Sequence, residues 1–154
     1  MRRATIANFA TTAAEAGTVE VVEAQLAIKK TQRSDVRELA QHIMADHAEA
    51  NAKLALLAKQ LNLRLAEGLD EADRRKVDSL NALSGETFDR AYINDQIAAH
   101  DSGVSLFTAE GRRGREPQLK FFASSTLPVL QSQPKMIKDI ARTDGPRPGE
   151  LAQP

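Results

Sequence analysis

Apolar residues recur at helical spacing over most of the chain. A strict alternation of four and three residues places one set on a single helix face: Val36, Ala40, Ile43, His47, Ala50, Leu54, Leu57 and Leu61. A second face carries Ile93, Ile97, His100, Val104 and Phe107. A third carries Leu119, Phe122, Thr126, Val129, Gln133, Met136 and Ile140. We find no alternating strand pattern of useful length, so the chain is predicted to be all-α.

Local end signals divide the chain into four main helices and a short one. Ser34, Asp70 and Ser84 are good N-cap residues, and Pro117 suits the first turn of a helix. Pro128 and Pro134 are expected to kink or interrupt the last helix. The predicted helices cover about 5–30, 34–61, a short segment after residue 70 that carries Val77 and Leu80, 84–113 and 117–140.

Short links between successive helices place them antiparallel. The links at 31–33 and 114–116 are short, whereas the connection over 62–83 is long and contains the short helix. We therefore expect an antiparallel four-helix bundle with a short extra helix in the long connection. The bundle is assigned to residues 1–141, and the polar Pro/Gly segment over 142–154 is predicted to be a disordered tail.

Composition and charge narrow the function classes. The 21 basic and 21 acidic residues cancel, which argues against a nucleic-acid partner. The lack of cysteine excludes disulfides, thiolate metal sites and cysteine nucleophiles. No segment approaches the length of a membrane span, and Met1-Arg2-Arg3 lacks the apolar run of a signal peptide. The chain is expected to be cytoplasmic as it stands, or an exported protein whose presequence lies outside it.

Three polar residues interrupt the apolar faces near mid-bundle: His47, His100 and Gln133. Glu20 joins them if the first helix buries the face of Phe9, Ala13, Ala16 and Ala27, but not if it buries Val19, Val22 and Leu26. Buried polar groups need ligands or hydrogen bonds. One interpretation is a site for Fe, Mn or Zn formed by Glu20, Asp46, His47 and His100. The other is a structural hydrogen-bond network that includes Gln133. His42 lies off the face and is expected to be solvated.

Several short elements resemble a bacterial family of unknown function. The resemblance rests on Glu20-Val21, the run from Ala40 to His47, Leu83-Ser84-Gly85, the run from Phe88 to Tyr92, His100, Phe122-Ala123 and Leu127-Pro128. It implies a ferritin-like four-helix bundle without established activity, whose members are often labelled outer-membrane or exported proteins, and it suggests a role in stress response or the cell envelope. The family's Leu-Pro-x-Leu-x-x-His element ends here in Gln133, which would remove one metal ligand.

Known catalytic motifs are missing from the chain. A ferritin-like di-iron site needs Glu-x-x-His pairs, and none occurs. Phosphate-binding glycine loops and the nucleophile elbow are also missing. The leading interpretation is therefore a non-enzymatic bundle with no cofactor, and the alternative is a metal-binding redox or storage protein. A homodimer formed through helix faces is the expected form of self-association.

Overall fold

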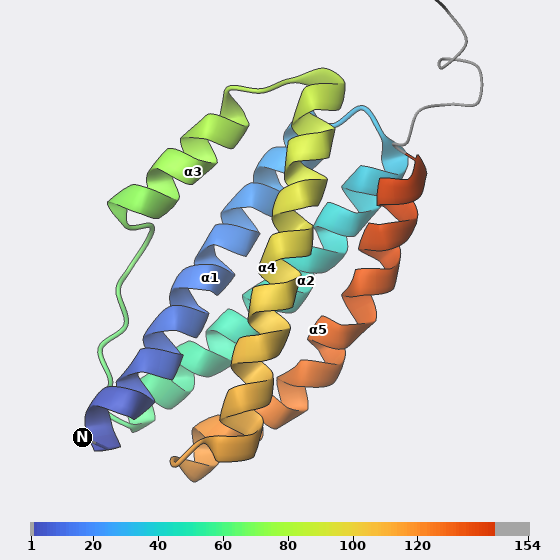
Figure 1. Cartoon of the computed structure of the whole chain (residues 1–154). Helices are drawn as coiled ribbons and strands as arrows, with labels where there is room; N and C mark the ends of the chain where they lie inside the picture. The colour runs from blue at the N-terminus through green and yellow to red at the C-terminus, as the bar shows by residue number, and fades with distance from the viewer. Residues whose placement is uncertain (1, 144–154) are drawn as a thin grey trace, which may run out of the picture.

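The computed structural model describes residues 2–143, which form an all-α bundle (Figure 1). Its helices are α1 (Arg2–Lys30), α2 (Ser34–Gln60), α3 (Glu71–Asn81), α4 (Gly85–Arg113) and α5 (Pro117–Thr143). The four long helices pack antiparallel, and the short helix α3 lies between α2 and α4 in the chain. The predicted fold class is confirmed.

The bundle consists of two helical hairpins joined by a long connection. The hairpin α1–α2 packs on the hairpin α4–α5, with α1 against α4 and α2 against α5. The connection after α2, together with α3, returns the chain along the outside of the bundle, so that α4 starts at the end where α2 starts (Figure 1). Each long helix therefore runs antiparallel to both of its neighbours.

The core has two apolar halves. One half, near the α1–α2 turn, contains Ala24, Ala27, Val36, Leu39, Ala40, Ile43, Leu80, Phe88, Tyr92, Ile93, Ile137 and Ile140. The other half contains Phe9, Ala10, Ala13, Leu54, Phe107, Leu119, Phe122, Ala123 and Leu130. On each long helix the residues between these two sets include buried or half-buried polar side chains. The polar interruptions seen in the sequence thus form one layer across the middle of the bundle.

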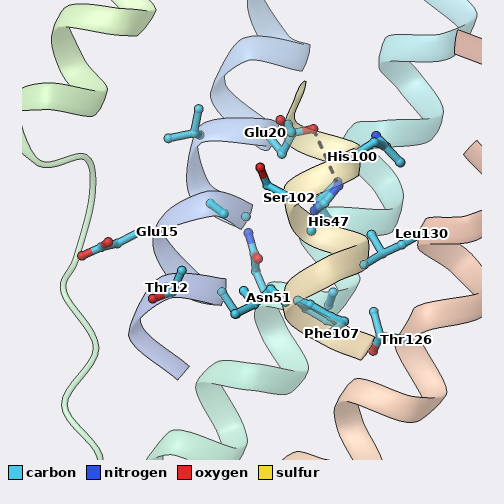
Figure 2. Close-up of a pocket in the computed structure, with 18 of the residues that line it drawn as sticks. Thr12, Glu15, Glu20, His47, Asn51, His100, Ser102, Phe107, Thr126 and Leu130 are labelled. Carbon is cyan, nitrogen blue, oxygen red and sulfur yellow. Dashed lines mark ion pairs between the residues drawn. The ribbon is translucent and has the colours of Figure 1, made fainter. Parts of the chain in front are cut away.

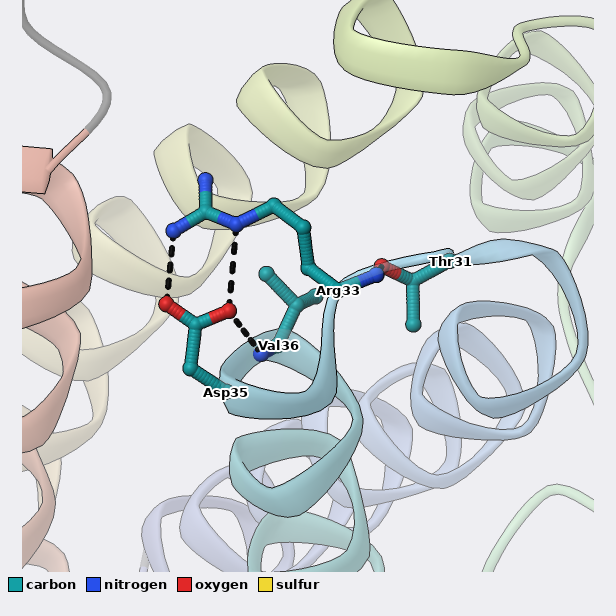
Figure 3. Close-up of polar contacts among 4 residues, drawn as sticks. All are labelled: Thr31, Arg33, Asp35 and Val36. Carbon is teal, nitrogen blue, oxygen red and sulfur yellow. Dashed lines mark hydrogen bonds and ion pairs between the residues drawn. The ribbon is translucent and has the colours of Figure 1, made fainter.

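The tight turn between α1 and α2 is held by local hydrogen bonds (Figure 3). The Arg33 guanidinium donates to both carboxylate oxygens of Asp35, with Nε–Oδ1 3.0 Å and Nη2–Oδ2 2.6 Å. Asp35 Oδ1 also accepts from the Val36 N–H at 2.8 Å. The residue in the N-cap position is Arg33 rather than the predicted Ser34, which already belongs to the helix. The first backbone N–H groups of a helix have no partner within the helix. At the start of α2 the Asp35 carboxylate accepts from one of them, the Val36 N–H, in place of an N-cap side chain.

The short helix α3 begins as predicted. Asp70 is its N-cap, and the Asp70 side chain accepts from the Asp73 N–H at 2.7 Å. Val77 and Leu80 are buried, whereas the other face of α3 is exposed. The helix therefore lies on the bundle surface, over the side formed by α1 and α4.

The last helix departs from the prediction in three ways. It is continuous through Pro128 and Pro134, so the predicted interruption is wrong, and it extends past Ile140 to Thr143. At two positions after Pro128 the buried residue is one later than predicted: Leu130 is 6% exposed while the predicted Val129 is 40% exposed, and Ile137 is buried more fully than the predicted Met136. Gln133 and Ile140 are buried as predicted. The predicted tail beyond residue 143 lies outside the described residues.

Other expectations concern exposure. His42 is exposed, as predicted. The first helix starts at Arg2, three residues before the predicted start. On α4 the buried face is wider than the predicted one and includes Phe88, Tyr92 and Gln96. Within residues 2–143, each helix is too short or too polar to cross a bilayer.

Candidate functional site

Glu20 lies in the polar middle layer, on the inward face of α1, and is 4% exposed. Its Oε1 accepts a hydrogen bond from Gln96 Nε2 on α4 at 3.5 Å, and its Oε2 lies 3.7 Å from His47 Nε2 on α2 (Figure 2). Burial, and next the charge of Glu23, raise the pKa of Glu20 from 4.5 to about 8. The Glu20 carboxyl is therefore mostly protonated at neutral pH. The first helix buries Glu20 together with Phe9, Ala13 and Ala27 of the first predicted face, but Ala16 of that face is exposed and Val19 of the alternative face is buried.

His47 is the partner of Glu20 on α2. Burial, followed by the nearby His100, lowers the pKa of His47 from 6.5 to about 4. The imidazole is thus neutral at neutral pH, and its contact with Glu20 joins two uncharged groups. The 3.7 Å separation exceeds the length of a hydrogen bond.

His100 and Gln133 occupy the opposite side of the same layer, each 5% exposed. Neither ring nitrogen of His100 has a hydrogen-bond partner among the residues that the structure describes, and burial lowers the pKa of His100. The Gln133 side chain and the Leu130 carbonyl lie near His100 and act to raise its pKa, although neither meets the geometry of a hydrogen bond with the ring. Pro134 lies four residues after Leu130 and cannot donate the helical N–H to that carbonyl.

Asp46 faces a different partner. Its Oδ2 accepts a hydrogen bond from Gln133 Nε2, which joins α2 to α5. The sequence-predicted residues thus form two contacts, Glu20 with His47 and Asp46 with Gln133, while His100 lies near Gln133 and influences His47. The part of the chain that the structure describes contains no group of three His, Asp or Glu side chains placed to hold a metal ion. The four-residue metal site stays a prediction, and its ligands would have to move to converge.

Sequence reasoning did not single out two residues of the layer. Glu23 and Gln96 are completely buried, and both carboxylate oxygens of Glu23 lack a hydrogen-bond partner in the protein. Burial, and next the Asp95 charge, raise the pKa of Glu23 from 4.5 to about 7. Helical spacing could have identified both residues, because Glu23 follows Glu20 by one turn and Gln96 precedes His100 by one turn.

A cavity of about 540 Å³ begins at this layer and extends into the half of the bundle that holds Phe107. Glu20, His47 and His100 line its polar end, and an apolar wall is formed by Leu54, Leu106, Phe107, Phe122 and Leu130 (Figure 2). Small residues from three helices keep the space open: Ala16, Gly17, Ala50, Ala98, Ala99 and Gly103. Asp70, Asp73 and Lys76 of the α3 region contribute to its edge.

The sequence profile of a family described as a domain of unknown function, DUF4142, matches residues 2–140. This chain belongs to the DUF4142 family. None of the curated proteins compared with this DUF4142 domain matches it in sequence. Its structure is similar to the crystal structure of a DUF305 fragment from Deinococcus radiodurans, with a TM-score of 0.77 and 14% identity. The match covers 90% of this chain and 95% of that one, and at this identity it shows a shared fold alone.

Proposed function

We propose that this DUF4142 domain is a non-enzymatic binding protein whose interior cavity takes a small amphipathic molecule. The observation that carries the proposal is the cavity of about 540 Å³ with one polar end and one apolar wall. Ligand pockets in proteins have volumes of about 300–1,000 Å³ and are mostly apolar, with a few polar groups that orient the ligand. The cavity has this size and this division of surface.

The small residues around the space also support a binding role. Ala50 of α2 and Ala99 and Gly103 of α4 line the cavity, where larger apolar side chains would reduce its volume. We expect an occupant that binds only the folded chain to stabilise it by mass action.

A cavity-filling variant tests the proposal. Gly103 lines the cavity on α4, and a Cβ at this position would meet no atom within 4 Å. Gly103→Met should place a flexible apolar side chain in the cavity and raise helix stability by about 1 kcal/mol, because glycine is a poor helix former. The variant should remain folded and lose ligand binding.

Binding is measured by titration of the full chain with a neutral fluorescent amphiphile, N-phenyl-1-naphthylamine. The wild type should bind it at one saturable site, and Gly103→Met should not. Ala109→Met, at an exposed position of the same helix outside the cavity, is the matched control and should bind as the wild type does. Equal binding by Gly103→Met and wild type would refute the proposal.

A second candidate function is binding of Fe, Mn or Zn by Glu20, His47 and His100. It is favoured because these residues come from three helices and line one cavity, with imidazoles that burial keeps neutral. Neutral imidazole is the form that binds metal. Stoichiometric metal in untagged protein, lost in a His47→Ala/His100→Ala double variant, would support this function, whereas metal-free protein that does not take up Zn²⁺ would refute it. Gln133→His should add an imidazole near His100 and tighten Zn²⁺ binding.

A further inference from the structure

The polar end of the cavity has an unbalanced acidic character. We propose that the cavity is built for a molecule whose polar head is an organic ammonium ion seated at Glu20, an inference that rests on the binding function proposed above. An apolar body attached to the ammonium group would lie along the wall that contains Leu54 and Phe107.

The first support is the charge around Glu20. Glu23 lies one turn away from Glu20 on α1. The negative charge of Asp95 on α4 raises the pKa of both glutamates. The basic group that acts on them is Lys76, an exposed residue of α3 at the cavity edge. His47 supplies no compensating charge, because burial keeps it neutral. A cation bound at Glu20 would supply that charge, whereas an anion would face two buried carboxyl groups.

The second support is a set of buried atoms that have no hydrogen-bond partner in the described part of the chain, residues 2–143. They include Glu20 Oε2, His47 Nε2 and both ring nitrogens of His100, all from residues that line the cavity. Glu20 and His100 are each at least nine-tenths buried. Figure 2 shows the contact between Glu20 and His47 at the end of the cavity, and His100 lines the same cavity from α4. An alkylammonium group has three N–H donors, and carboxylate and neutral imidazole supply acceptors for them. Each such bond would be charge-assisted.

Charge distinguishes an ammonium head from a neutral or an anionic one. An ammonium ion favours the ionised form of an adjacent carboxyl group, whereas an alcohol brings no charge to Glu20 and a carboxylate brings a like charge. The charged or titratable groups around the head are Glu23 of α1, Asp46 and His47 of α2, Lys76 of α3, and Tyr92, Asp95 and His100 of α4.

The experiment compares three probes of equal chain length by calorimetric titration of the full chain: octylammonium, octanol and octanoate. Octylammonium should bind at least tenfold more tightly than octanol at pH 8, and octanoate should bind most weakly. Glu20→Gln should remove the tenfold preference and leave octanol binding unchanged. Glu49→Gln, at an exposed position of α2 outside the cavity, is the matched control and should retain the preference.

The outcomes separate this inference from the proposed function. Equal binding of octylammonium and octanol, tightest binding of octanoate, or an unchanged preference in Glu20→Gln would overturn the ammonium head while leaving the cavity as a binding site. If none of the three probes binds at one saturable site, both the inference and the proposed function fail. Circular dichroism of both glutamine variants verifies that they are folded.

Discussion

Glu20→Gln should change how the stability of the domain depends on pH. The folded chain holds the Glu20 proton up to a pKa of about 8, whereas the unfolded chain releases it near 4.5. Between these values the folded state binds more protons, so the free energy of unfolding falls as pH rises. The stabilisation is complete below the unfolded pKa and is lost as pH rises through the folded pKa. The glutamine variant has no proton to lose at this position.

The magnitude follows from the shift. For a carboxyl that titrates near pH 8 when folded, the loss between about pH 6.5 and 8 is about 2 kcal/mol. Glu23, with a pKa of about 7, contributes a smaller loss of the same sign in both proteins. His47 and His100 have lowered pKa values and act with the opposite sign, mainly below pH 6.5, so they cancel in the comparison.

The assay is urea denaturation followed by circular dichroism at several pH values between 6.5 and 8. The wild type should lose about 2 kcal/mol more than Glu20→Gln across this range. Glu15→Gln should follow the wild type, because its carboxyl lies outside the buried layer. If Glu20→Gln loses stability as steeply as the wild type, Glu20 does not hold a proton in the folded state, and the description of the layer is wrong.

Two further predictions concern packing. Leu54→Ala should lower the free energy of unfolding by about 2–5 kcal/mol, and Leu56→Ala should be nearly neutral, because the two leucines are 2% and 59% exposed on the same helix. Similar effects in denaturant titrations would contradict the assigned face of α2. A Cβ at Gly17 would lie 2.0 Å from Asn51 Oδ1, so Gly17→Ala should gain about 1 kcal/mol only when Asn51 is also replaced by alanine. A double-mutant cycle without coupling between these sites would show that this contact does not constrain the glycine.

The sequence determined the helices and their order. Cap residues, the short links and the 3.6-residue periodicity act within one helix or between neighbours in the chain. They placed both ends of α2 and α4, and the start of α3, to within about one residue. The same local logic predicted a polar middle layer, because His47, His100 and Gln133 interrupt three apolar faces.

The composition of that layer was decided by tertiary packing. Glu23 stands between Val22 and Ala24, and the sequence pattern alone does not bury it; the packing of α1 against α4 does. Asp46 was expected beside the histidines, but the position of α5 directs it to Gln133. After Pro128, α5 buries Leu130 and Ile137 in place of the predicted Val129 and Met136, while it keeps Gln133 and Ile140 inside, a change that a fixed heptad spacing does not show.

The cavity also depends on how the helices are aligned with one another. Alanine and glycine are frequent on several faces of this chain. At the middle of the bundle, small residues of α1, α2 and α4 line one cavity together. A helix's own periodicity is fixed by its sequence, whereas the axial alignment of helices arises only from their mutual packing. For that reason the sequence determined which faces are buried, and the tertiary structure decided where the interior stays open.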